Sequence, residues 1–172
     1  MNKILFAAII ILMFPFTGFG QSDKWVSYTS YEGHYTINFP AAPNESVERD
    51  TASGVITTIH FADYEINDST LFMCGWIDLT NQLDTVTDIK QTLENSRDGA
   101  TSSMKTTEVN TLAINLEDEP YIEFTFKGED FAGKDRIYII NKFQYSLISM
   151  FPLRKENLPD ADKFIHSFKH LL

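Results

Sequence analysis

Two histidines near the end of the chain have the spacing that lets two imidazoles meet one metal ion. His166 and His170 are four residues apart, which on a helix places them on the same side. No third ligand is evident, and both side chains would point away from the apolar stripe of that helix, into solvent. We therefore interpret them as an ordinary solvated helix face, with a weak metal site as the alternative.

A glycine-containing segment, residues 128–135, almost matches a phosphate-binding loop. Gly128, Gly133 and Lys134 stand in the required order, but Asp135 occupies the place of the serine or threonine that would bind magnesium. The segment also joins two strand patterns, whereas a phosphate loop leads from a strand into a helix. The pattern therefore predicts a hairpin loop, and we expect no nucleotide and no other cofactor.

Acidic residues are clustered at 117–119, at 129–130 with Asp135, and at 160–162, where carboxylates could hold calcium. None of these groups has the regular ligand spacing and the closing glutamate of a known calcium loop. Asp160 and Asp162 are better explained by the electrostatics of a helix N-terminus, and the others by solvated turns. No Gly-x-Ser-x-Gly elbow is present, so we predict no catalytic residue and regard a hydrolase as the least favoured function.

Cys74 is the single cysteine of the chain, so no intramolecular disulfide can form. It lies in the segment 71–77, which is apolar on both faces and typical of a central strand covered on both sides. The neighbouring sequence offers neither a base nor a positive charge that would lower the pKa of a thiol. We therefore expect a buried, unreactive thiol, with an intermolecular disulfide as the alternative.

The N-terminus has the order of a secretory signal peptide. Lys3 gives a positive start, residues 4–16 form an apolar run, and Gly18 and Gly20 are the small residues of a cleavage site. The run is shorter than the roughly 20 apolar residues of a comfortable membrane helix. We predict an exported protein, periplasmic or extracellular, that begins at Gln21 and has no membrane anchor after cleavage. An uncleaved N-terminal anchor is the alternative.

The chain is acidic, with a formal net charge of −10 and an isoelectric point of about 4.7. Only Lys3 among the charged residues would leave with a signal peptide over 1–20, so the mature charge would be one unit more negative. The negative electrostatic field of such a protein repels phosphate backbones and anionic lipid, which proteins bind chiefly through Lys and Arg. We therefore predict no nucleic-acid partner, and we expect another envelope protein or a small ligand; the oligomeric state stays open.

The spacing of the apolar residues predicts the secondary structure. Period-two spacing predicts strands over 34–39, 55–61, 71–79, 121–126, 136–143 and 145–151, the last two as a hairpin. Helical spacing follows over 84–100 and 159–171; Thr85 with Asp88 resembles a capping box, and Pro159 opens the second helix. This order indicates one α+β domain over 21–172, an antiparallel sheet with helices packed on it. A β-sandwich or barrel with an appended helix is the alternative.

Short aromatic motifs lie near both ends of this expected domain. They are Trp25-x-x-Tyr28, then Tyr31-Glu32-Gly33-x-Tyr35-x-Ile37-x-Phe39-Pro40-x-x-Pro43, then Gly54 before a long strand, and Phe164-x-x-Ser167-Phe168-Lys169. In this order they resemble the PsbP-like superfamily of exported α/β/α sandwich domains. The resemblance implies an antiparallel sheet between helical layers and an accessory or binding role without catalysis. It implies no functional residue in this chain.

Together, the N-terminal pattern, the PsbP-like resemblance and the lack of a catalytic set predict a non-catalytic exported domain. Its expected role is to bind or assist another component of the cell envelope. The alternative is a carrier of a small apolar ligand or lipid, held between sheet and helices. Phe72, Trp76 and Phe126 are the candidate lining residues, although aromatic side chains at such positions are more often plain core.

Overall fold

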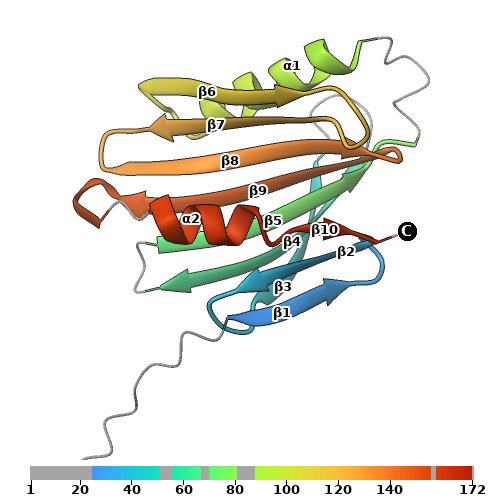
Figure 1. The fold of residues 1–172 in the computed structure, drawn as a ribbon, viewed down its shortest axis with the longest axis horizontal. Helices are drawn as coiled ribbons and strands as arrows, with labels where there is room; N and C mark the ends of the chain where they lie inside the picture. The colour runs from blue at the N-terminus through green and yellow to red at the C-terminus, as the bar shows by residue number, and fades with distance from the viewer. Residues whose placement is uncertain (1–24, 51–55, 67–69, 81–87, 156–157, 172) are drawn as a thin grey trace, which may run out of the picture.

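The computed structural model describes residues 25–50, 56–66, 70–80, 88–155 and 158–171. In these residues two antiparallel sheets carry two α-helices (Figure 1). The strands are β1 (Val26–Ser30), β2 (Tyr35–Phe39), β3 (Asn44–Asp50), β4 (Thr57–Ile66), β5 (Thr70–Asp78), β6 (Glu108–Asn115), β7 (Tyr121–Lys127), β8 (Phe131–Ile140), β9 (Phe143–Pro152) and β10 (Lys169–His170). The helices are α1 (Ile89–Ser103), α2 (Leu158–Ile165) and the short 3₁₀ turn η2 (Leu153–Lys155).

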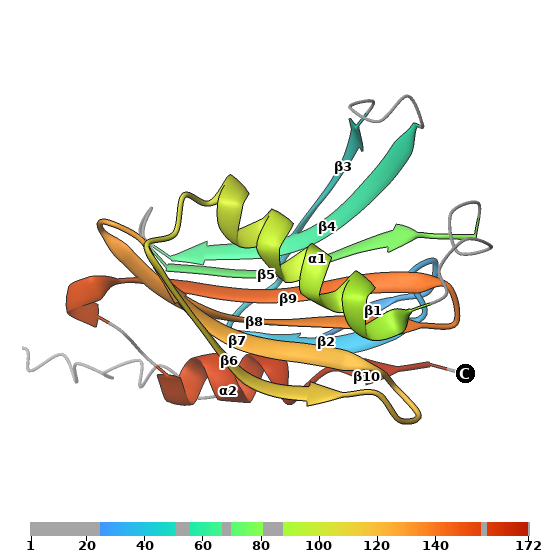
Figure 2. The same cartoon turned by 90° about the horizontal axis from the view of Figure 1, so that it is seen from above.

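The larger sheet has seven strands among the described residues, in the order β3-β4-β5-β9-β8-β7-β6. The smaller sheet has the order β1-β2-β10. Figure 2 shows α1 on one face of the larger sheet and α2 on the other, with the ends of β3 and β4 rising on the side of α1. The antiparallel α+β architecture confirms the fold class that the periodicity predicted.

Two hydrophobic cores lie on opposite faces of the larger sheet, because side chains alternate along each strand. The first core lies beneath α2 and the smaller sheet, where Phe39, Phe72 and Phe164 are buried together. The second lies beneath α1, where Leu93 packs among residues of β7, β8 and β9. The predicted inward face of 34–39 is confirmed, because Tyr35, Ile37 and Phe39 are at most 1% exposed.

Helix α1 begins at Ile89 because the side chain of Asp88 caps it, accepting a hydrogen bond from the backbone N–H of Gln91 at 3.1 Å. The predicted capping box is therefore wrong at Asp88, which precedes the helix as its cap and is not the third residue after a cap at Thr85. The predicted helix over 84–100 also ends three residues too early, since α1 ends at Ser103. Its predicted start, with Thr85, lies outside the described residues.

Helix α2 is shorter than the predicted 159–171, because the chain leaves the helix after Ile165 and pairs with β2. Ser167 Oγ accepts a hydrogen bond from the backbone N–H of Asn38 at 2.9 Å, and the backbone N–H of Leu171 donates to the carbonyl of His34 at 2.7 Å. Phe168 still lies in the first core. The apolar residues after Ile165 are therefore positioned by a turn and a strand, and not by a continued helix.

The segment 128–135 is a loop only in its first part. Gly128 donates its backbone N–H to the carbonyl of Phe131 at 2.8 Å, which closes a tight turn between β7 and β8. Strand β8 then begins at Phe131, so Gly133, Lys134 and Asp135 lie within a central strand. The prediction of a loop up to residue 135, and of a strand that begins at 136, is therefore wrong. Strand β8 can include Lys134 and Asp135 because each of these side chains has a hydrogen-bond partner in the fold.

Cys74 lies in β5 between β4 and β9 and is fully buried, as its apolar surroundings predicted. Burial raises the pKa of its thiol to about 12. We expect the native protein not to react with a thiol reagent until it unfolds. Cys74→Ser should lower the free energy of unfolding by about 1–3 kcal/mol, because the added hydroxyl is poorly satisfied. Rapid labelling of the folded protein would contradict the central position of β5.

Candidate functional site

One face of the larger sheet is only partly covered. Helix α1 packs on β7 and β8 and leaves the neighbouring face of β4 and β5 without a helix above it. Ile59, Phe61, Met73 and Ile77 point to this side and are only half-buried. A hollow therefore opens between α1 on one side and the rising strands β3 and β4 on the other.

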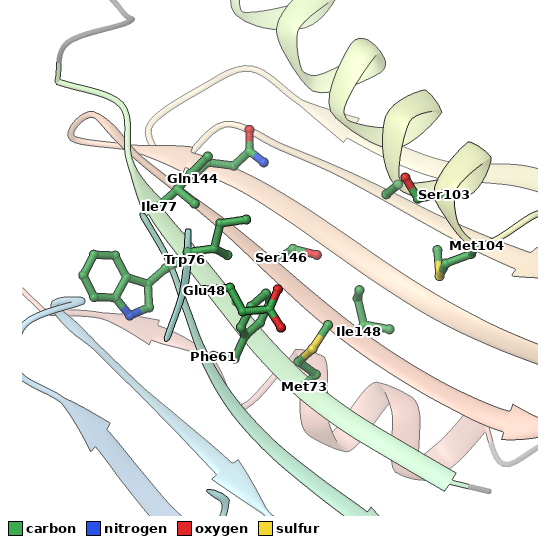
Figure 3. A pocket seen from close by; sticks show the side chains of 13 residues that line it. Glu48, Phe61, Met73, Trp76, Ile77, Ser103, Met104, Gln144, Ser146 and Ile148 are labelled. Carbon is green, nitrogen blue, oxygen red and sulfur yellow. The ribbon is translucent and has the colours of Figure 1, made fainter. Parts of the chain in front are cut away.

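This hollow is a cavity of about 540 Å³ (Figure 3). Most of its lining is apolar and comes from β4, β5, β9 and the C-terminal half of α1: Ile59, Phe61, Met73, Ile77, Ala100, Met104 and Ile148. Gly75 contributes to the floor, where the ring of Phe61 lies so close that an added Cβ would be 3.2 Å from it. Sites that bind small molecules have this size and this apolar character.

The polar groups of the cavity lie mainly along β9. Gln144 and Ser146 are two residues apart on the same face of the strand and are half-buried. Ser96 of α1 donates its hydroxyl proton to Oε1 of Gln144 at 2.9 Å. The hydroxyl of Ser146 donates to the carboxylate of Asp135, with both oxygens at 3.2 Å. These contacts fix the two side chains that the cavity can offer to a ligand.

Asp135 lies in β8, next to β9 and on the same face of the sheet as Ser146, and is completely buried. Burial raises the pKa of its carboxyl to about 7, although hydrogen bonds from Ser146 and from the backbone N–H groups of Leu147 and Arg136 oppose the rise. In the sequence, Asp135 stands between Lys134 and Arg136, a pattern typical of a solvated turn, so its burial could not be predicted from its neighbours.

The rim of the cavity is acidic. Glu48 of β3 and Ser103 of α1 both line the cavity and are exposed to solvent. Among the lining residues that the structure describes there is no Lys, Arg or His. An anionic group entering this cavity would thus find a like charge at the rim and no cation inside.

The three predicted lining residues are not brought together. Phe72 is buried in the first core, and Phe126 is buried beneath α1 in the second. Trp76 borders the cavity through its strand, but Figure 3 shows its indole directed away from the other labelled side chains. Its ring instead stacks on His60 with centroids 3.9 Å apart. Alternation along β5 explains this, since even-numbered residues face the first core and odd-numbered ones the cavity.

The two predicted metal candidates lie on different elements. His166 follows the end of α2, and its Nε2 accepts a hydrogen bond from Arg136 at 2.9 Å, since a guanidinium can only donate. His170 is in β10, where its ring meets Tyr145 edge to face. The helical spacing that made them a candidate pair is therefore absent. The described part of the chain holds no group of three or more His, Cys, Asp or Glu side chains suited to a metal ion.

No protein-family model matches this chain, and no curated protein matches it in sequence. Among solved structures, that of cyanobacterial PsbP (CyanoP) from Synechocystis sp. PCC 6803 is similar, with a TM-score of 0.57 over 86% of this chain and 93% of that chain. This chain has a PsbP-like fold. The two sequences are 7% identical, so the likeness concerns the fold alone and confirms the resemblance that the aromatic motifs indicated.

A buried ion cluster joins the larger sheet of this PsbP-like domain to α2. Lys134 Nζ lies 2.7 Å from Oε1 of Glu123 and 2.6 Å from Oδ1 of Asp162. Arg136 pairs with the other oxygen of Glu123 and donates to the hydroxyl of Tyr138 at 3.0 Å. Burial alone would raise the pKa of Glu123, but these two cations outweigh it and hold the pKa below its usual range.

The two acidic residues near the start of α2 have structural roles. Asp162, predicted to act on the helix dipole, instead holds α2 against β8 through Lys134. Asp160 does lie in the first turn of α2, as predicted. Because the charges of the cluster pair with one another, it offers no free group for a ligand, and the cavity beside α1 remains the better candidate site.

A second, smaller cavity of about 140 Å³ lies on the other side of β4, between the two sheets. Tyr28, Glu45 and His60 are among its lining residues. Burial, with a hydrogen bond to Glu45, raises the pKa of Tyr28 to about 12. Its volume is below the range usual for small-molecule sites, so we do not treat it as the functional site. Within the described residues, no helix is both long and apolar enough to cross a membrane.

Proposed function

We propose that this PsbP-like domain is a non-catalytic binding protein that takes up a small apolar ligand in the cavity between α1 and the larger sheet. The observation that carries the proposal is a cavity of about 540 Å³ whose walls are half-buried aliphatic, aromatic and methionine side chains. Such walls gain free energy when a ligand removes them from water, at about 25 cal/mol per Å² of apolar surface. Methionines at Met73 and Met104 can adapt to ligands of different outline.

The lining favours retention of a ligand over its chemical conversion. Nucleophilic or acid–base catalysis needs an activated nucleophile and a base within hydrogen-bond reach of each other. Ser146 and Asp135 are within this reach, but Asp135 is completely buried and is not among the residues that line the cavity, so it cannot return a proton to a bound ligand. We therefore assign these polar groups to ligand orientation.

The setting of this function is also part of the proposal. The signal-like N-terminus supports an exported protein, and the ligand would then be taken up outside the cytoplasm or passed to another envelope component. A pull-down from host envelope fractions tests this accessory role. Recovery of a defined envelope protein supports it, and recovery of the domain alone counts against it.

Filling the cavity from α1 is expected to abolish ligand uptake. Ala100 lines the cavity, so Ala100→Trp would place an indole in the space that the ligand needs. We expect the affinity for the neutral apolar dye N-phenyl-1-naphthylamine to fall by at least about tenfold, measured by its fluorescence. Unchanged dye binding by folded Ala100→Trp protein would reject this cavity as the site.

The neighbouring residue supplies a matched control. Gly99 is exposed on the same helix, and an added Cβ there would meet nothing within 4 Å. Gly99→Trp therefore adds the same indole on the solvent side and should leave dye binding unchanged. Native mass spectrometry of protein purified from its own host gives an independent test: a retained mass of ligand size supports the carrier role, and a clean apo mass counts against it.

A further inference from the structure

The charges around the cavity restrict the polar group that its ligand can carry. Glu48 is exposed at the rim and Asp135 is buried beside Ser146, while the described lining includes no cation. The whole chain has a formal charge of −10. A carboxylate or phosphate in the cavity would lose its hydration without gaining a counter-ion, which is costly. The cavity therefore discriminates against anionic amphiphiles such as free fatty acids.

Two side chains of β9 present complementary hydrogen-bonding groups to the cavity. Ser96 donates to Oε1 of Gln144, which leaves the amide NH₂ of Gln144 to donate to a ligand. The proton of the Ser146 hydroxyl is directed at Asp135, which leaves its oxygen to accept from a ligand. Residues two apart on one face of a strand are separated by roughly 6.5–7 Å, so one oxygen atom can lie between these two groups.

We infer that the ligand carries an uncharged hydroxyl, which accepts from Gln144 and donates to Ser146, and an apolar body that lies against Met104 and Ile148. This inference rests on the proposed function and adds to it the chemical class of the ligand. A hydroxyl satisfies both groups at once, because it is donor and acceptor. An ester lacks the donor, a carboxylate lacks it and adds a charge, and an ammonium lacks the acceptor.

Compounds with one alkyl chain and different polar ends test the inference. 1-Decanol, methyl decanoate, decanoate and decylammonium would each displace N-phenyl-1-naphthylamine from the whole mature protein. We expect 1-decanol to bind at least about tenfold more tightly than decanoate and about fivefold more tightly than methyl decanoate. Decanoate or decylammonium binding as tightly as 1-decanol would overturn the assignment of a hydroxyl while leaving the proposed function intact.

Two variants assign the selectivity to the side chains named. Ser146→Ala should weaken 1-decanol about fivefold and leave methyl decanoate unchanged, because only the alcohol donates to Ser146. Gln144→Met should weaken both compounds, and it keeps the assignment testable if Ser146→Ala fails to fold. Ser102→Ala is the control: Ser102 is an exposed serine of α1 that is not among the lining residues of the cavity.

The outcomes separate this inference from the proposed function. If the dye binds, is excluded by Ala100→Trp, and yet is displaced equally by alcohol, ester and acid, the cavity binds apolar ligands without the hydroxyl selectivity. Equal loss of 1-decanol binding in Ser146→Ala and Ser102→Ala would likewise overturn the role of Ser146. If the dye does not bind the wild-type protein at all, the proposed function itself fails.

Discussion

Raising the pH from about 5 to about 8 is expected to destabilise the wild-type protein by about 2–3 kcal/mol through Asp135 alone. Burial raises the pKa of this carboxyl to about 7, above its unfolded value of 3.8, so the folded state holds the proton more tightly. A group of this kind stabilises the folded state while it is protonated. The contribution is complete below pH 3.8 and is lost as the pH rises through about 7.

Asp135→Asn should remove this pH dependence, because the amide resembles the protonated acid and does not ionise. We expect the variant to gain stability relative to wild type as the pH rises, measured by chemical denaturation at several pH values. All other titratable groups are common to both proteins, so their contributions cancel in the difference. Glu129→Gln, which changes an exposed acid in the β7–β8 turn, should give a profile parallel to wild type. A parallel profile for Asp135→Asn would show that the buried carboxyl is not protonated on folding.

Removal of Lys134 is expected to cost about 3–5 kcal/mol of unfolding free energy. The side chains of Lys134 and Glu123 are each 8% exposed, so Lys134→Met leaves a buried carboxylate with Arg136 as its remaining cation. It also frees Asp162, which holds α2 against the sheet. The loss should appear in urea denaturation and as faster amide hydrogen exchange in α2 than in α1.

A surface ion pair on the neighbouring strand provides the control for that substitution. Lys127 Nζ lies 3.7 Å from Oε2 of Glu108, and the two side chains are 45% and 65% exposed. Lys127→Met should therefore change stability by less than about 1 kcal/mol. Similar effects of the two substitutions would mean that water reaches the ion cluster and that burial adds nothing to it.

The sequence by itself determined the elements whose neighbours in the chain decide their structure. The alternating residues of β2, and the segment of β5 around Cys74 that is apolar on both faces, depend on local spacing. Period two places one face inward wherever the strand lies in the sheet. For the same reason the α+β class and the antiparallel sheet could be predicted without knowing the strand order. The cap of α1 was not predicted correctly, because Asp88 caps the helix itself and is not the third residue after a cap at Thr85.

Strands β3 and β6 were not predicted, and the reason is their place at the edges of the larger sheet. An edge strand can expose both faces, so its sequence need not alternate; Val47 of β3 is 59% exposed and Leu112 of β6 is 47% exposed. The end of α2 was misplaced because pairing with β2, rather than helix propensity, takes up residues 169–170. Such pairing depends on residues far away in the chain.

The position and the lining of the candidate site depend on the tertiary structure. The cavity exists because α1 packs over β7 and β8 and leaves β4 and β5 partly uncovered, and no local pattern specifies where a helix lies across a sheet. Its polar groups come from β9 and are oriented by Ser96 of α1 and Asp135 of β8. Asp135 resembles a solvated residue in the sequence, but burial inside β8 gives its carboxyl a pKa near neutrality. Local spacing determines which face of a strand is apolar, whereas packing determines whether that face is filled by the protein or left open for a ligand.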